Sequence, residues 1–558
     1  MRDPAYNPVR YGHFLIFIAG LGGLLYGIDI GIIAAALLYL SKTVNLTVEQ
    51  TSFIVAAVLG GSMVSSLVAG VLADYFGRKK MVLASALLFI ASVVLIVLSQ
   101  GFVPLMAGRL LQGVSGGVIA VVVPLYLAEC LSAQYRGRGT AFFQLMLTFG
   151  IVIAAATGWF YTHQAEAAIR AAAGNQTLIR AAQDHAWRGM FLSVIYPGLA
   201  FFLGGIVLSE TPRWLYRQGR TAEAWTALLR SVSETEAKRE MQEMQELALA
   251  KHTSDSIIST DSLWQRKYVV PFVLACVILT CNQATGINSI LGFLVIILRQ
   301  AGLSAGHATS ADVTVKLLMC AMTAVAITLV DKKGRKFLLK IGTGGVVVAL
   351  VLAGLLFLGV ERQRMDVTQP VRSVIQHNAV SLSMRSEIFR APKDGRLMDL
   401  TVLYSYGDGD KVVNVLSSDA TPALNIVPPG KVKHSLLIKR AEYGPVPSQK
   451  IGWMITACLC IFIAFYAVGP GVVVWLTLSE LMPMRIRSTG MGIALLLNQG
   501  TATLIAALFL MVVGHYGYSV MFMAWAASTV LYFLTAAIFL PETKGKTLEE
   551  IEKSFDRS

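Results

Sequence analysis

Charged residues are scarce in this chain. Asp, Glu, Lys and Arg together make up 14% of its 558 residues, whereas 55% are hydrophobic and the mean hydropathy is +0.63. A soluble chain would carry about a quarter charged residues. The composition therefore excludes an ordinary soluble globular protein and favours a chain that lies largely within a lipid bilayer.

Cysteine is also rare, and all of its occurrences fall within or at the ends of apolar runs. Such placement forms no disulfide framework, and the spacing does not fit a zinc site. We expect the cysteines to be small apolar packing residues. Because the chain also lacks a phosphate-binding loop and a nucleophile–base arrangement, we expect no cofactor, no metal and no enzymatic reaction. The six cysteines are Cys130, Cys276, Cys281, Cys320, Cys458 and Cys460.

Long apolar runs, by contrast, recur along the whole chain. Runs of about 20 apolar residues predict membrane-spanning helices. The first run is too long for a signal peptide, and no small-residue cleavage site follows it. Twelve spans are predicted, at 12–36, 51–73, 81–99, 104–128, 140–160, 189–208, 268–298, 312–330, 337–360, 452–478, 488–513 and 518–540.

The net charge of +14 could suggest a nucleic-acid partner, but its distribution argues for membrane topology. If the spans alternate, the basic loop residues fall on one side, whereas the short loops 99–103 and 513–518 carry no Lys or Arg. By the positive-inside rule, both termini are predicted to be cytoplasmic. No basic–aromatic binding module is visible, so we expect a lipid bilayer and no nucleic acid as partner.

One short basic motif occurs twice. Asp74, Gly77, Arg78 and Lys79 recur 257 positions later, in Asp-Lys-Lys-Gly-Arg-Lys at 331–336. A repeat in matching loops of two hydrophobic halves indicates a duplicated membrane bundle, and such bundles usually transport a solute. The expected fold is an all-α membrane protein with two pseudo-symmetric six-helix halves, at 1–208 and 268–540.

Three segments lie outside the spans. The polar segment 209–267 is predicted to form cytoplasmic linker helices, with amphipathic stretches at 221–231 and 236–250, and 541–558 is a cytoplasmic tail. The segment 361–449 interrupts the second half and is predicted to be a small β-rich extracytoplasmic insertion. Its expected strands are 398–406 and 411–416, with a turn signal at 406–410 between them and another at Pro428, Pro429 and Gly430.

The role of this insertion is open from sequence. We expect it to be dispensable for transport and available to an outer partner. The alternative is that it caps the pore entrance and takes part in substrate selection.

The motifs together strongly resemble the sugar porter family of the major facilitator superfamily, over nearly the whole chain except 361–449. Each motif alone is weak, but the set in this order is highly specific. The matching stretches are Gly22 to Asp29, Asp74 to Lys80, Pro124 to Glu129 followed by Arg136 and Gly137, Glu210 to Leu215, Asp331 to Lys336 and Pro541 to Gly545.

Asp29 lies within the first span, where an unpaired carboxylate is costly and therefore a functional candidate. Its expected partner is Arg109 on the fourth helix. The resemblance implies that an acid at this place couples proton movement to transport. The alternative is a static buried ion pair.

The resemblance also implies a set of cytoplasmic acids and bases that form ionic links between helices and hold the outward-facing state. Plain positive-inside topology is the competing explanation, but it does not explain the acids. The predicted gating residues are Asp74, Arg78, Glu129, Arg136, Glu210, Asp331, Arg335, Glu480 and Arg487.

Sugar hydroxyls both donate and accept hydrogen bonds, so a sugar site needs amides and aromatic faces. A single amide could equally be a helix–helix hydrogen bond. By resemblance, the sugar contacts are Gln144, Gln283, Asn288, Trp475 and Asn498, with Tyr26 and Tyr466 as aromatic walls.

Several positions depart from the family pattern. Asn282, Met319 and Gln499 stand where Gln, Asn and Trp are common, which leaves the identity of the sugar open and would allow a cyclitol or another polyol. Lys316 fits no motif, and we expect its side chain to extend outward from the eighth span.

The expected function is proton-coupled uptake of a monosaccharide by alternating access, with the sugar and protons as partners. A passive sugar or polyol facilitator would use the same site without coupling. A sugar-sensing receptor is a further alternative, but family-type sensors carry long cytoplasmic tails and the tail here is short.

Overall fold

The computed structural model describes residues 8–131, 133–254, 265–384, 386, 389, 397–417, 422–428, 434–483, 486–544, 546, 550 and 555. Within these residues, twelve helical segments are long and apolar enough to cross a membrane, which confirms the predicted number of spans. The fold is mostly helical, with only small sheets, as the sequence predicts.

The N-terminal half contains the first six spans, and its helices pack into one bundle. The sixth span is divided at Val194 into two helices. The helices are α1 (Pro8–Thr43), α2 (Val48–Phe76), α3 (Arg78–Leu98), α4 (Phe102–Cys130), α5 (Ala133–Ala171), α6 (Gln176–Ser193) and α7 (Ile195–Val207).

The linker between the halves forms three helices, and two of them lie over the stretches 221–231 and 236–250 that the sequence marks as amphipathic. They are α8 (Pro212–Arg217), α9 (Thr221–Ser231) and α10 (Glu234–Ser254).

The C-terminal half repeats the six-span arrangement, with two of its spans broken into shorter helices. A π-helical turn over Ala467–Gly471 divides the tenth span. The helices are α11 (Arg266–Ala284), α12 (Ile287–Gln300), α13 (Ala305–Lys333), α14 (Arg335–Glu361), α16 (Gln449–Tyr466), α17 (Val472–Leu481), α18 (Arg487–Tyr516) and α19 (Tyr518–Ile538).

The duplicated motif forms equivalent turns in the two halves. Gly77 separates α2 from α3 and Gly334 separates α13 from α14, with φ of 99° and 89°. A side chain at either position would be strained and would meet the carboxylate of Glu210 or Glu542. These glycines therefore let a carboxylate approach the first turn of the following helix.

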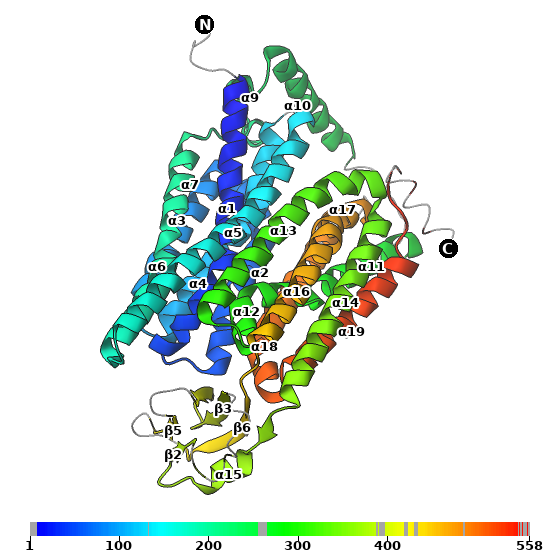
Figure 1. The fold of residues 1–558 in the computed structure, drawn as a ribbon. Helices are drawn as coiled ribbons and strands as arrows, with labels where there is room; N and C mark the ends of the chain where they lie inside the picture. Colours follow the sequence, from blue (N-terminus) through cyan, green and yellow to red (C-terminus); the bar gives the residue numbers. More distant parts are fainter. Residues whose placement is uncertain are drawn as a thin grey trace.

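The two halves lie side by side, with the start of α1 and the end of α19 at one end of the bundle and the small sheets at the other (Figure 1). We call these the terminal end and the insertion end. Across the boundary between the halves, α18 packs on α2, α13 on α5 and α12 on α1.

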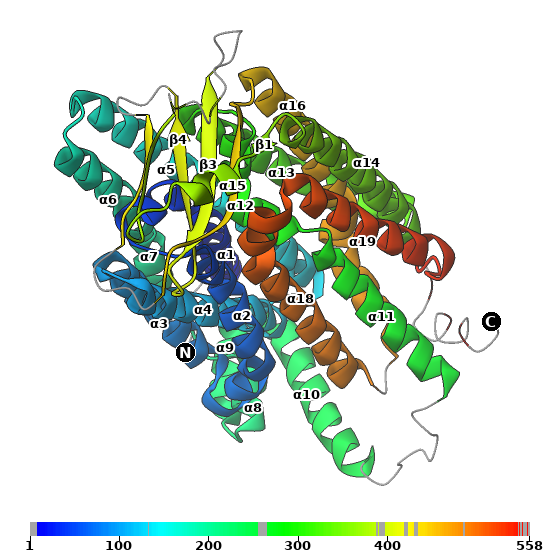
Figure 2. The same ribbon diagram turned by 90° about the horizontal axis from the view of Figure 1, so that it is seen from below.

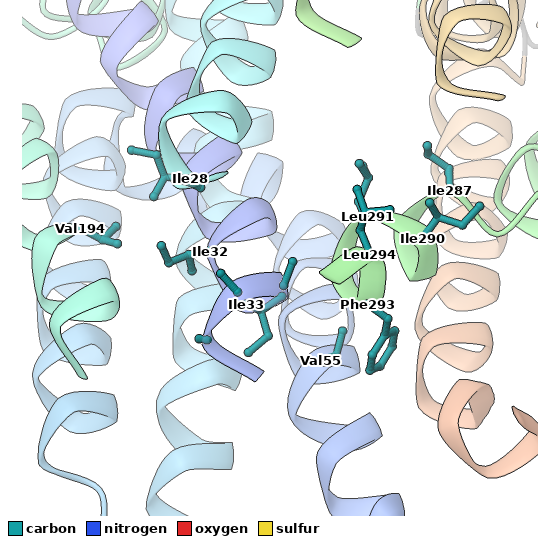
Figure 3. Close-up of a cluster of buried hydrophobic side chains, with 14 of the residues drawn as sticks. Ile28, Ile32, Ile33, Val55, Val194, Ile287, Ile290, Leu291, Phe293 and Leu294 are labelled. Atoms are coloured by element: carbon teal, nitrogen blue, oxygen red, sulfur yellow. The ribbon is translucent and has the colours of Figure 1, made fainter. Parts of the chain in front are cut away.

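The halves are joined closely toward the insertion end. One hydrophobic core includes Ile33 of α1, Val55 of α2 and Leu291 of α12, as Figure 3 shows. The indole nitrogen of Trp159 also donates to the Ser310 hydroxyl across the boundary, at 3.0 Å. This structure is therefore closed at the insertion end.

The insertion has its own hydrophobic core and two antiparallel sheets. The four-stranded sheet has the order β1-β6-β3-β4, and Ser405 pairs with Asp410 in the β3–β4 hairpin. This confirms the predicted strands and the turn between them, while the second predicted turn extends outside the described residues. The elements are β1 (Met365–Asp366), α15 (Thr368–Ser373), β2 (Val380–Ser383), β3 (Met398–Ser405), β4 (Asp410–Leu416), β5 (Ala423–Ile426) and β6 (Leu437–Pro445).

The insertion contacts both halves of the bundle, and Figure 2 shows its strands in front of helices of each half. The backbone N–H of Asp410 donates to both carboxylate oxygens of Glu49 in the N-terminal half, at 3.1 Å each. The guanidinium of Arg440 donates to the Gly514 carbonyl in the C-terminal half, at 3.0 Å. These contacts hold the insertion against both halves. Its dispensability stays a prediction.

We expect Glu49→Ala to loosen the insertion from the N-terminal half. A hydrogen bond to a charged acceptor contributes about 1.5–3 kcal/mol, so amide exchange over β4 should accelerate about tenfold or more. Hydrogen–deuterium exchange with mass spectrometry measures this directly. Glu223→Ala, at an exposed position of the linker, is the control. Unchanged exchange in β4 would show that the Glu49 contact does not hold the insertion.

Candidate functional site

The first buried polar site joins α1 to α4. Arg109 Nη1 lies 3.2 Å from Asp29 Oδ1, and both side chains are at most 1% exposed. The structure therefore brings together the two residues that the sequence pairs. Removing one partner of such a buried pair leaves an uncompensated charge, which is strongly unfavourable.

Two further residues complete this site. Arg109 also donates to Gln112 Oε1 at 2.7 Å, and its guanidinium lies 5.6 Å from the centre of the Phe191 ring. Asp29 Oδ2 is buried and has no hydrogen-bond partner among the described residues. That oxygen can accept a proton without first breaking a hydrogen bond.

The second site is built on a broken helix. The seventh span is interrupted between α11 and α12 at Gly286, which has φ of 82° and lies against the Trp525 ring. The Ser528 hydroxyl donates to the Ala284 carbonyl at the break, at 2.6 Å. Broken helices of this kind present polar groups near the middle of transporter bundles.

Three amides form a chain of hydrogen bonds beside the break. Gln283 accepts from the Asn288 amide at 2.7 Å and donates to Asn498 Oδ1 on α18, at 3.2 Å. Asn498 in turn donates to the Leu279 carbonyl at 2.9 Å. The structure therefore assembles three of the predicted sugar-contact residues, and their amides offer both donors and acceptors to a ligand.

The π-helical turn in the tenth span lies next to this chain. Asn282 donates to the carbonyl of Pro470 at 3.2 Å and accepts from the Tyr466 hydroxyl at 2.7 Å. Asn282 thus ties the seventh span to the irregular turn of the tenth. Asn282, which departs from the family pattern, therefore has a structural role in this state.

The remaining predicted sugar contacts are more dispersed. Gln144 is half-buried on α5 and Tyr26 is half-buried on α1, so the N-terminal half contributes both. Trp475 on α17 is 40% exposed and is not part of the amide chain. The structure therefore brings together Gln283, Asn288 and Asn498, but not all seven predicted residues.

At the terminal end, the predicted gating residues of the N-terminal half form one cluster. Arg78 Nη2 contacts Asp74 at 2.6 Å and Glu129 at 2.9 Å. Glu210 accepts from the Arg78 backbone N–H at 2.9 Å, and Thr211 donates to Glu129 at 2.6 Å. The cluster ties α2, α3 and α4 to the start of the linker.

The C-terminal half contains an equivalent cluster. Arg335 Nη2 contacts Glu480 at 3.0 Å, and the Arg335 backbone N–H donates to Glu542 at 2.9 Å. Thr543 donates to Glu480 at 2.6 Å, as Thr211 does to Glu129 in the first half. These ion pairs join residues of the same half, so they are not links between the halves in this state.

Three predicted gating residues cannot be placed in these clusters. The side chains of Arg136, Asp331 and Arg487 lie outside the described part of the structure.

Glu210 and Glu542 cap the starts of α3 and α14 by accepting from backbone N–H groups, but their surroundings differ. Burial raises the pKa of Glu210 above its usual value, although backbone N–H groups oppose the shift. Burial also acts on Glu542, but four backbone N–H donors outweigh it and lower the pKa. Because its folded-state pKa is lowered, Glu542 contributes stability at neutral pH that is lost as the pH falls through that pKa.

Lys316 corrects one expectation. Its side chain does not extend outward: it is fully buried, with Nζ 2.9 Å from Asp312 Oδ2. The outward orientation is wrong because a carboxylate one turn away on the same helix provides a partner inside the protein.

Sequence reasoning missed several of these partners. Asp312 lies four residues before Lys316, a spacing that could have indicated the pair. Gln112 likewise follows Arg109 by one helical turn. Thr211 and Thr543 directly follow Glu210 and Glu542. This equivalent position in the two halves could have indicated that both threonines belong to the clusters.

Comparisons with known proteins agree with this arrangement. The family model described as "Sugar (and other) transporter" matches residues 15–375 and 434–555, leaving out the middle of the insertion. The glucose transporter GlcP of Staphylococcus epidermidis is 27% identical, covering 98% of this chain and 97% of that protein. The proton myo-inositol cotransporter hmit-1.1 of Caenorhabditis elegans is 28% identical, covering 99% and 91%.

Among solved structures, the xylose transporter XylE from E. coli in an inward-open conformation superposes with a TM-score of 0.67. It shares 21% identity, and the match covers 98% of this chain and 100% of that one. This likeness supports the major facilitator fold. Because the family model spans both six-helix halves, the chain belongs to the sugar transporter family.

Proposed function

We propose that the protein moves a monosaccharide across a membrane together with protons, by alternating access. The observation that carries this proposal is the buried Asp29–Arg109 pair, in which one carboxylate oxygen has no partner among the described residues. Ionisable side chains are costly inside a membrane-spanning bundle, and those that are retained there usually mark a functional site. Its presence on α1, which packs on α12 of the other half, supports a link between proton binding and helix movement.

The amide chain is the proposed sugar site. A sugar that binds there exchanges the contacts among Gln283, Asn288 and Asn498 for contacts with its own hydroxyls. Amides suit this exchange because each can donate and accept. The half-buried Gln144 lies on the opposite half, so we propose that bound sugar is contacted from both sides of the bundle.

Protonation of Asp29 is the proposed coupling step. A neutral carboxyl attracts Arg109 less strongly than a carboxylate does. The guanidinium then depends more on Gln112 and Phe191, and α1 is freer to move relative to α4. Sugar binding and proton binding would thereby favour the same rearrangement of the two halves.

The terminal-end clusters are the proposed gate. In this structure the halves meet at the insertion end, whereas the described ion pairs of the terminal end stay within each half. We propose that the two clusters approach each other when the terminal end closes, and that their exposed acids and bases then link the halves.

A passive facilitator, or a transporter of a cyclitol, is the second candidate. Relatives of this chain include both a glucose transporter and a proton myo-inositol cotransporter. The pocket also departs from the family pattern at Asn282, Met319 and Gln499, which would allow a polyol as the substrate.

Reconstitution in liposomes tests the proposal. We expect uptake of a radiolabelled monosaccharide to rise when the outside is made acidic, and to be accompanied by proton entry recorded with a trapped pH dye. A panel of hexoses, pentoses and myo-inositol, with empty liposomes as the control, identifies the substrate. Uptake that does not depend on the pH gradient would indicate passive facilitation. Transport of none of these solutes would contradict the proposal.

We also propose that the insertion is extracytoplasmic and both termini are cytoplasmic, in a cell membrane. The basic loops at the terminal end support this orientation. A cysteine introduced at Val427, which is 71% exposed, should react with an impermeant thiol reagent on intact cells or spheroplasts. The unsubstituted chain is the control for its native cysteines. Reaction only from the cytoplasmic side would reverse the topology.

A further inference from the structure

A second buried ion pair lies within α13, and its lysine also contacts the other half of the bundle. Lys316 Nζ on α13 contacts Asp312 Oδ2 at 2.9 Å, and it also donates to the Gly31 carbonyl on α1 at 3.2 Å. The side chains of Lys316 and Asp312 are 0% and 1% exposed. Neither residue takes part in the amide chain or the Asp29–Arg109 site.

The burial of this pair calls for a functional explanation. An ammonium and a carboxylate within a membrane-spanning helix are costly to desolvate, and an ion pair alone often fails to repay that cost. Asp312 Oδ1 is moreover left without a hydrogen-bond partner among the described residues. Packing alone would be served at lower cost by two apolar residues of similar volume.

Lys316 lies on α13 where the C-terminal half meets the N-terminal half, so movement of the halves affects its contacts. Cys320, one turn away, lies 3.6 Å from the Thr148 hydroxyl of α5, and Ser310 contacts Trp159 of the same helix. Lys316 therefore lies on the α13 surface that meets the N-terminal half. The carbonyl that it reaches belongs to Gly31, two residues after the proposed proton acceptor Asp29.

We propose that Lys316, oriented by Asp312, is a positioning residue for transport that holds α1 against α13 while the insertion end is closed. This inference rests on alternating access in the proposed function. The Lys316–Gly31 contact joins the two halves, so separation of α1 from α13 at the insertion end must break it. The ammonium stays paired with Asp312, because both lie on one helix.

A double variant tests this inference without leaving a buried unpaired charge. Asp312→Asn/Lys316→Met removes both charges and keeps similar side-chain volumes. Spin labels at Leu178 and Tyr516, both exposed and in opposite halves near the insertion end, report the separation of the halves by pulsed electron paramagnetic resonance. We expect the ratio of separated to closed molecules to rise about tenfold, because a charge-assisted hydrogen bond is lost.

Two companion variants distinguish positioning from packing. Lys316→Arg keeps a charged donor and should retain the closed distribution, whereas Lys340→Met removes a charge from an exposed position of α14 and should change nothing. An unchanged distance distribution in a folded double variant would overturn the inference. So would a shift in Lys316→Arg as large as that in the double variant.

The distance measurement needs neither a known sugar nor proton coupling. If liposomes show no sugar transport but the distances shift as expected, the proposed function fails and the role of Lys316 stands. If transport is retained and the distances do not change, the role of Lys316 fails alone.

Discussion

Replacing Asp29 by Asn is expected to abolish uphill accumulation of sugar. Asn keeps the shape of the side chain but can neither carry the negative charge nor bind the transported proton. The buried guanidinium of Arg109, 3.2 Å from the Asp29 carboxylate in this structure, would then remain in the same arrangement throughout the cycle. The proton gradient would no longer drive sugar uptake, although the two halves could still alternate between opening to either side of the membrane.

The measurement compares two assays in the same liposomes. Gradient-driven accumulation should fall to the level of empty vesicles, while counterflow exchange of labelled for unlabelled sugar should stay measurable. Asp184→Asn, which removes a partly exposed carboxylate near the insertion end, serves as the control and should accumulate normally. Full accumulation in the Asp29 variant would exclude this residue from coupling and favour a static ion pair.

Much of the fold could be predicted from the sequence because its signals are local and repeated. Each span is an apolar run of sufficient length, and the duplicated motif around Asp74 and Asp331 defines the two halves. The β3–β4 hairpin was predictable because alternating strands flank a Gly-Asp turn at 406–410. The linker helices α9 and α10 could be predicted from their amphipathic pattern.

The candidate site could be predicted only in part, since its geometry depends on distant elements. Asp29 and its partner Arg109 were identified from the cost of a carboxylate within a span. The amides were identified through resemblance, and the structure places Gln283, Asn288 and Asn498 in one chain. The Lys316 contact with Gly31 could not be predicted, because it depends on how α13 meets α1.

The docking of the insertion was also beyond sequence reasoning. Glu49 and Asp410 are separated by most of the chain, and no motif relates them. The ion pairs at the terminal end are a further example: they lie within each half in this structure, and the sequence could not distinguish that arrangement from links between the halves. Contacts that change during the cycle leave no periodic pattern in the sequence.

Gln283→Ala is expected to weaken sugar binding by about tenfold or more. Gln283 is the central member of the amide chain, since it accepts from Asn288 and donates to Asn498. Its removal takes away one contact to the sugar and leaves the buried amide of Asn498 and the half-buried amide of Asn288 poorly oriented. An unpaired buried polar group costs about 1–3 kcal/mol, which is the size of the expected loss.

Equilibrium binding of a radiolabelled sugar to the purified protein measures this effect, with membrane expression checked alongside. Gln176→Ala, at an exposed position near the insertion end, is the matched control because it removes the same amide away from the site. Asn288→Ala should resemble Gln283→Ala, since it breaks the same chain. Gln144→Ala and Trp475→Ala extend the test to the other predicted contacts. An unchanged dissociation constant in all four site variants would place the sugar elsewhere in the bundle, because no ligand bound to this chain of amides could lose its central member without cost.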